Sequence, residues 1–206
     1  MILETLFVGS LEVNCYILAE GKDSSCIIID PGYEEEKIKK VLVRHRLKPA
    51  FIINTHGHID HIGCDDKFNV PVYIHRKDAP LLKDADLNLS NLLMSPFTVN
   101  SEIRQVEDQD NIELGQIRLK VIHVPGHTPG GICLSQESPK ENILFTGDSL
   151  FCGGIGRTDF LGADEKMLIK NIKDKLLVFP DDTVIYPGHG PSSTIGREKT
   201  SNPFLS

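Results

Sequence analysis

Potential metal ligands are concentrated in one short stretch of the chain, residues 55–61, with the sequence THGHIDH. Three histidines and one aspartate lie within six residues there: His56, His58, Asp60 and His61. In an extended segment residues i and i+2 point to the same side, so His56 and His58 can hold one ion. Asp60 and His61 lie where the loop should turn into a helix, and they can hold a second. Imidazole nitrogens with carboxylate oxygens suit Zn²⁺, and also Fe or Mn.

Three further candidate ligands each follow a β-prone run, in turns rich in Gly and Pro. His127 lies in VPGHTPGG, Asp148 in FTGDSLF and His189 in YPGHGP. Each signal is weak alone, but loops at strand ends are where a rigid scaffold presents functional groups. Together with residues 55–61 they indicate a metal centre assembled from several loops. The other histidines are expected to be structural: His45, His75 and His123.

The elements that must position these loops follow from the apolar pattern. β-prone runs cover residues 2–8, 14–19, 25–30, 50–53, 72–74, 117–124, 131–135, 143–146 and 183–186. Helices are expected over residues 33–47, closed by Pro49, over 76–84, and over 164–177 with Asp164 as the N-cap. Residues 86–109 are expected to form a long surface loop. Two β-rich halves, each ending in helices, favour the α/β class, with sheets sandwiched by helices.

Composition excludes several classes of protein. The 206 residues fit a single domain, 1–206, and the net charge of −7 argues against a nucleic-acid partner. No apolar run approaches the roughly 20 residues of a membrane span, and no basic signal-peptide start is present. Five cysteines, odd in number and without CxxC, favour free thiols, with Cys64 and Cys152 as small buried residues. We expect a cytoplasmic protein that binds neither nucleic acid nor membrane. The oligomeric state is left open.

The order of these motifs resembles the metallo-β-lactamase superfamily. The His-x-His-x-Asp-His motif is followed by Gly-His at 127, Gly-Asp at 148 and Gly-His at 189, and an Ile-Asp-Pro-Gly segment holds Asp30. The match runs from about Asn14 to His189, and it is closest to the short members of the glyoxalase II branch, the hydroxyacylglutathione hydrolases. The resemblance implies an αββα sandwich, two mixed β-sheets flanked by helices, with a dinuclear metal site at one edge.

The resemblance also implies a role for each candidate. One ion, expected to be Zn²⁺, is held by His56, His58 and His127. The other is held by Asp60, His61 and His189. Asp148 bridges the two ions, and Asp30 orients ligands without binding metal.

The implied activity is hydrolysis of small thioesters such as S-lactoylglutathione. A hydroxide bridging the two ions attacks the carbonyl, and Asp60 or Asp148 relays the proton. No GxSxG motif offers a serine nucleophile. Lactam cleavage is not expected, because many true β-lactamases have cysteine at the position of Asp148. A nuclease of the same superfamily is disfavoured by the negative charge, and a non-catalytic binding protein by the complete ligand set.

One alternative activity and one substrate contact remain open. Residues 156–160, GRTDF, also resemble the persulfide dioxygenases, in which one iron with open positions would be held by histidines and Asp148. Arg157 is a candidate for gripping a substrate carboxylate, or else for structuring its own loop with Asp159. Only 17 residues follow His189, so the C-terminal helical glutathione-binding domain of the long enzymes is expected to be absent.

Overall fold

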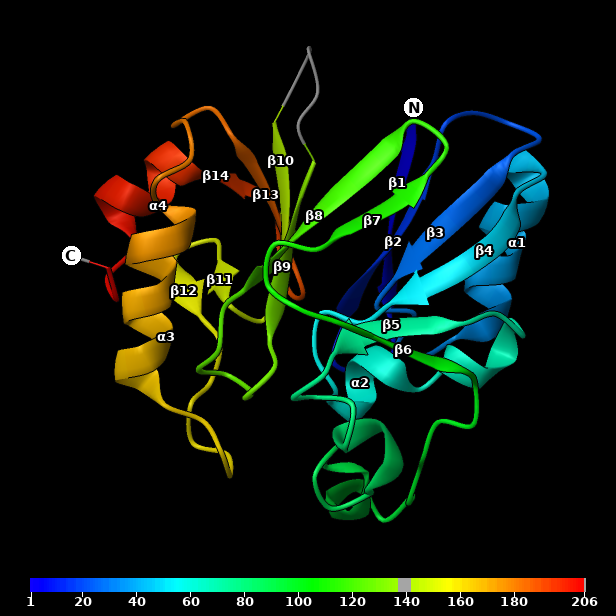
Figure 1. The fold of residues 1–206 in the computed structure, drawn as a ribbon, viewed down its shortest axis with the longest axis horizontal. Helices are drawn as coiled ribbons and strands as arrows, with labels where there is room; N and C mark the ends of the chain where they lie inside the picture. Colours follow the sequence, from blue (N-terminus) through cyan, green and yellow to red (C-terminus); the bar gives the residue numbers. More distant parts are fainter. Residues whose placement is uncertain (137–141, 206) are drawn as a thin grey trace.

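Two six-stranded β-sheets lie face to face in the computed structural model, which describes residues 1–136 and 142–205 (Figure 1). The first sheet has the order β1-β2-β3-β4-β5-β6, antiparallel from β1 to β3 and parallel from β3 to β6. Its strands are β1 (Ile2–Val8), β2 (Val13–Ala19), β3 (Ser25–Ile29), β4 (Lys48–Ile53), β5 (Val72–His75) and β6 (Ile103–Val106).

The second sheet has the order β14-β13-β10-β9-β8-β7, and it is antiparallel except where β10 runs parallel to β13. Its strands are β7 (Asn111–Leu114), β8 (Ile117–His123), β9 (Ile132–Gln136), β10 (Ile143–Gly147), β13 (Val184–Pro187) and β14 (Ser193–Thr194). A small hairpin of β11 (Leu150–Phe151) and β12 (Gly154–Ile155) follows β10.

Helices cover the outer faces of both sheets. Helix α1 (Glu35–His45) packs Ile38, Val41 and Leu42 against the first sheet, while α3 (Glu165–Asn171) and α4 (Ile195–Ser201) flank the second (Figure 1). A wide turn, Ile172–Leu176, continues α3, and the one-turn helix α2 (Ile59–Ile62) lies at the sheet edge. This arrangement confirms the αββα sandwich.

Strand β2 shows why the first sheet is buried on both faces. Successive strand residues point to opposite faces. Cys15 and Ile17 therefore pack into the layer under α1, whereas Tyr16 and Leu18 enter the core between the sheets. Phe145 reaches that shared core from β10 of the other sheet. A continuous apolar run is consequently needed, and the sequence supplies one.

Several predicted elements differ from the structure. Residues 76–84 are not a helix: they form turns and one short 3₁₀ turn, Leu81–Lys83, because Pro80 has no N–H to continue a helix. The expected loop 86–109 contains β6, a partly exposed edge strand with a weak apolar pattern. Pro49 does not close α1, which ends at His45. Pro49 lies inside β4, where the pairing with β3 shifts register.

The structure bears on two expectations, one about membrane-spanning helices and one about the cysteine thiols. Within residues 1–136 and 142–205, no helix is long and apolar enough to cross a membrane. All five cysteines are free, as predicted, and Cys64 is buried. Cys152 is only partly buried, contrary to expectation, because it lies in the turn between β11 and β12. Cytoplasmic location stays a prediction.

Candidate metal centre

All seven predicted ligands converge at one edge of the sandwich, each carried by a loop or short helix at the end of a strand. The loop after β4 leads into α2 and carries four of them, the β8–β9 loop carries one, and one follows each of β10 and β13. The seven are His56, His58, Asp60, His61, His127, Asp148 and His189. The expected turn into a helix at Asp60 and His61 is α2.

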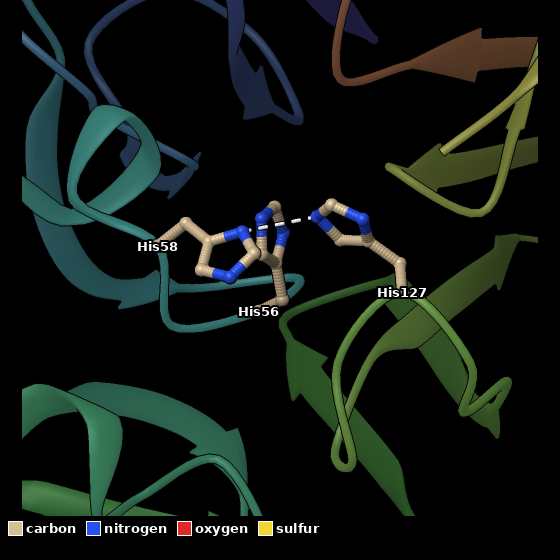
Figure 2. A group of neighbouring side chains, drawn as sticks. All are labelled: His56, His58 and His127. Carbon is tan, nitrogen blue, oxygen red and sulfur yellow. Dashed lines mark hydrogen bonds between the residues drawn. The ribbon is translucent and has the colours of Figure 1, made fainter. Parts of the chain in front are cut away.

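Three imidazoles from both sheets form what we call the first ligand group: His56, His58 and His127. Their nearest nitrogens lie within 4.8 Å of one another, and the rings face a common point (Figure 2). His58 Nδ1 and His127 Nε2 are 3.0 Å apart. Two nitrogens on one tetrahedral Zn²⁺ lie about 3.3 Å apart, given Zn–N bonds of about 2.05 Å. The spacing therefore fits a single ion.

Hydrogen bonds fix which nitrogens of the first ligand group are free to bind an ion. His127 Nδ1 donates to the carbonyl oxygen of Arg157 at 2.7 Å. In the neutral ring Nε2 therefore carries no proton, and its lone pair can bind an ion. The Thr55 hydroxyl donates to Asp30 at 2.7 Å, and its oxygen lies 3.2 Å from His56 Nδ1, which it can accept from. His56 Nε2 then also has a free lone pair that can bind an ion. Asp30 acts through Thr55 in this chain of contacts.

Asp60, His61 and His189 form the second ligand group, and their ligand atoms also lie within 4.8 Å of one another. His189 Nδ1 donates to the carbonyl of Leu11 at 2.9 Å, so Nε2 faces Asp60 Oδ2 at 3.4 Å. His61 Nδ1 lies 3.0 Å from Asp30 Oδ2, and its Nε2 is turned inward. Asp30 therefore contacts the second group directly, through His61, and the first group only through Thr55.

Asp148 lies between the two groups. Its Oδ1 is 3.5 Å from His61 Nε2, and its Oδ2 is 3.7 Å from His127 Nε2 and 3.6 Å from His189 Nε2. His61 Nε2 and Asp148 Oδ1 are buried and have no hydrogen-bond partner among the described residues. A buried polar atom without a partner is costly, and a cation between these two atoms would satisfy both. The donor set therefore fits a pair of metal ions.

The two groups differ in their protonation. Burial, followed by the neighbouring His127, lowers the pKa of His58 to about 3. Burial, followed by His61, also lowers the pKa of His56 well below its usual value. These imidazoles are neutral, as a metal ligand must be.

In the second ligand group, the attraction between carboxylates and imidazoles shifts the pKa values more than burial does. Burial alone lowers the pKa of His61, but Asp60, Asp30 and Asp148 raise it to about 10. Burial alone raises the pKa of Asp60, yet His61 and His189 bring it below its usual value. Burial alone lowers the pKa of His189, but its bond to Asp60 and the charges of Asp148 and Asp60 together raise it above its usual value. Without metal, this group holds protons.

Asp78 is a buried carboxylate that the sequence analysis missed. It accepts from Gly57 N at 3.2 Å, from Thr128 Oγ1 at 2.7 Å and from Gly130 N at 2.6 Å. These donors belong to the two loops that carry the first ligand group. Asp78 therefore ties the loop from the first sheet to the loop from the second, and no local motif marks it.

Gly188 lies so close to the ligand side chains that a larger residue would not fit. A Cβ atom there would lie 2.1 Å from Asp148 Oδ1 and 2.9 Å from His61 Cε1. Only glycine lets the chain pass this close to the centre before His189.

A cleft of about 420 Å³ opens onto both ligand groups and includes Arg157 in its lining. The Arg157 guanidinium donates two hydrogen bonds to Asp159, at 3.0 and 2.7 Å, and lies 4.5 Å from the Phe160 ring centre. The pairing with Asp159 is the second of the two sequence alternatives. A contact with a substrate carboxylate stays a prediction.

The remaining histidines lie elsewhere in the fold. His75 and His123 stack with ring centres 3.9 Å apart, and His45 contacts Glu4 at 2.7 Å. These contacts agree with the structural roles expected for all three.

Known proteins are similar to this chain in sequence and in fold. A profile of the Metallo-beta-lactamase superfamily matches residues 8–189. Hydroxyacylglutathione hydrolase GloC of Haemophilus influenzae is 35% identical over 211 residues, which cover 100% of this chain and 98% of GloC. The crystal structure of BLEG-1 B3 metallo-beta-lactamase is 38% identical with a TM-score of 0.89, and that of TTHA1623 in a di-iron-bound form is 34% identical with a TM-score of 0.80. In both comparisons the similarity covers 100% of this chain and 100% of the other chain.

Proposed function

This chain belongs to the metallo-β-lactamase superfamily of metallo-hydrolases, and we propose that it hydrolyses thioesters at a dinuclear metal centre. The observation that carries the proposal is the convergence of seven ligand side chains, with Asp148 between two groups, at the base of an open cleft. We assign His56, His58 and His127 to one ion and Asp60, His61 and His189 to the other. Asp148 is assigned to both ions.

The chemistry divides between the ions and the chain. Two divalent ions, when bound, would lower the pKa of a water molecule and polarise the thioester carbonyl. The chain holds the ligand atoms in place through the Arg157 carbonyl, the Leu11 carbonyl and the Asp30 carboxylate. In the overall reaction a carbon–oxygen bond forms, the carbon–sulfur bond breaks, and the products are a carboxylic acid and a thiol.

We assign the proton transfer to Asp60 or Asp148. Both carboxylates line the cleft and are slightly exposed, so a water molecule in the cleft can reach them. His61 and His189 keep the pKa of Asp60 low against the effect of burial, so its carboxylate is ionised, as a metal ligand must be. The proton then passes to the departing thiolate.

The relatives support a thioester substrate and leave the metal open. GloC, at 35% identity over the full chain, is named as a hydroxyacylglutathione hydrolase, which makes S-lactoylglutathione the first substrate to test. Zn²⁺ is our proposed ion because three imidazoles and carboxylates suit it. The di-iron form of TTHA1623 supports iron as the other choice.

The test combines metal analysis with turnover on purified protein. We expect about two ions per chain, together with hydrolysis of S-lactoylglutathione that Asp148→Asn abolishes. The matched control is Asp181→Asn, which changes an exposed aspartate outside the cleft. Full metal loading without hydrolysis of any thioester would refute the proposal. A β-lactam belongs in the same assay, because BLEG-1 is named as a lactamase, whereas Asp148 predicts no lactam cleavage here.

Iron-dependent persulfide oxidation is the second candidate. The di-iron-bound form of TTHA1623, 34% identical, favours iron as the metal, and the first ligand group with Asp148 offers the histidines and carboxylate that a single iron would need. One iron per chain, with O₂ consumed in the presence of glutathione persulfide and no thioester hydrolysis, would establish this activity instead.

A further inference from the structure

Beyond the metal ligands, the wall of the cleft is apolar. The contributing side chains are Leu11, Ile59, Leu89, Leu92, Leu93, Phe151 and Phe160. Apart from the histidines of the centre, the single basic side chain among the described lining residues is Arg157, and it is already paired with Asp159. The cleft therefore offers little to an anionic ligand beyond the centre itself.

Apolar side chains are also left exposed at the mouth of the cleft. Leu92 and Leu93 end the short turn Ser90–Leu93 with exposed fractions of 74% and 54%, and Leu11, on the loop between β1 and β2, has 58%. Grouped exposed apolar side chains beside a cleft are typical of a ligand-binding surface. These leucines come from loops of separate elements, yet they line the same cavity as His58 and Asp148.

We infer that this cleft binds an apolar acyl chain of several carbons, so that the preferred substrate is the thioester of an aliphatic acid rather than of a small hydroxy acid. The inference rests on the proposed thioester hydrolysis and names its substrate class. A thioester has two sides, and the thiol carriers of cells are polar and charged. The charged carrier has no free basic partner on this wall, so it faces the solvent, and the acyl chain lies against the leucines.

The size of the effect follows from apolar burial. Each methylene that leaves water contributes enough to raise kcat/KM about two- to fourfold when its burial persists in the transition state. From an acetyl to a hexanoyl thioester, four methylenes predict a rise of about 20- to 200-fold. The carrier is held constant in this comparison.

The experiment uses the metal-loaded protein and acetyl, butanoyl and hexanoyl thioesters of one carrier. In the double variant Leu92→Ser with Leu93→Ser we expect the hexanoyl-to-acetyl ratio of kcat/KM to fall at least about tenfold. The matched control is Val43→Ser, which removes an equally exposed apolar side chain from α1 and should keep the ratio. Both changes are at exposed positions, so folding is preserved.

A second readout separates this inference from the proposed function. Binding of acetate, butanoate and hexanoate is measured by calorimetry, which needs no turnover. Affinity that rises with chain length, and is flattened by the double variant, supports the apolar site even if no thioester is hydrolysed. Hydrolysis that does not depend on acyl length overturns the inference and leaves the thioesterase proposal standing. Flat affinities together with no hydrolysis overturn both.

Discussion

The two ligand groups of the centre are prepared for metal in opposite ways. In the first, burial lowers the pKa of two of the three imidazoles, His56 and His58, and brings that of His58 to about 3, so both are neutral. The second mixes carboxylate and imidazole, and there Asp60, Asp30 and Asp148 raise the pKa of His61 to about 10 despite burial. The first group is ready to bind an ion, whereas the second holds protons that an ion must displace. A buried carboxylate cluster needs positive charge, and without metal the histidines supply it.

Asp148 contacts residues of both groups, so its substitution should have the largest effect and should weaken both. We expect Asp148→Ala to lower metal content from about two ions per chain to below one and to reduce hydrolysis by about 10³-fold or more. Elemental analysis and thioester turnover measure both effects. Full double occupancy in the variant would contradict the shared position of Asp148.

The pH dependence of metal affinity should separate the groups next. An ion entering the second ligand group displaces a proton from His61, so affinity should rise about tenfold per pH unit for each proton released, up to pH about 10. In the first ligand group burial keeps His56 and His58 neutral, so these two release no proton over the same range and the affinity should rise less steeply with pH. Competition with a chelator between pH 6 and 8.5 measures the two slopes. Parallel slopes would mean that the groups are not prepared differently.

Asp78 provides a way to weaken one group alone. Asp78→Asn keeps the volume but replaces one carboxylate oxygen by an amide donor, which must face either the N–H of Gly130 or the N–H of Gly57. We expect affinity in the first ligand group to fall about 10- to 100-fold, the usual effect of losing an outer partner, with a smaller change in the second. Asp65→Asn is the control, because Asp65 is also fully buried. Equal losses in both groups would show a general effect on the fold.

The protons of the second ligand group should also appear in the stability of the metal-free protein. The folded pKa of His61, about 10, lies above its unfolded value of about 6.5. Its stabilisation is therefore complete below pH 6.5 and is lost as pH rises toward 10. We expect the Tm of metal-free protein to fall by several degrees between pH 7 and 9.5. The Tm of the metal-loaded protein should change less over the same range.

The residues at the centre illustrate what a sequence can predict. His56, His58, Asp60 and His61 form a local motif, and the other three ligands each follow a strand in a Gly-containing turn, so all seven were predicted. Asp78 was not, because its role exists only where loops some 20 and 50 residues away meet its carboxylate. The apolar wall was missed for the same reason, since Leu11, Leu92 and Phe160 are distant in sequence.

The elements divide in the same way. Buried strands such as β2 and β10 carry continuous apolar runs and were predicted within a residue or two. The sequence predicts a loop where β6 lies, because Arg104 and Gln105 face solvent at the sheet edge. Helix α4 has seven residues and a short apolar signal, so its capping residue Thr194 was not recognised. Strong local patterns, continuous or periodic, predict the elements that carry them, and tertiary pairing decides the rest.

The smallest expected effect concerns Arg157, which supports the centre with its backbone and lines the cleft with its side chain. Its carbonyl accepts from His127 Nδ1, as the Leu11 carbonyl does from His189 in the other group. Arg157→Ala keeps that carbonyl and removes only the guanidinium, which is 69% exposed and paired with Asp159. An exposed pair contributes little. We therefore expect unchanged metal affinity and at most about a threefold rise in KM for thioesters of an anionic carrier, with neutral carriers unaffected. A loss of tenfold or more confined to anionic carriers would show that the guanidinium leaves Asp159 to bind substrate. Weaker metal binding would show that the side chain, and not only the carbonyl, holds His127 in place.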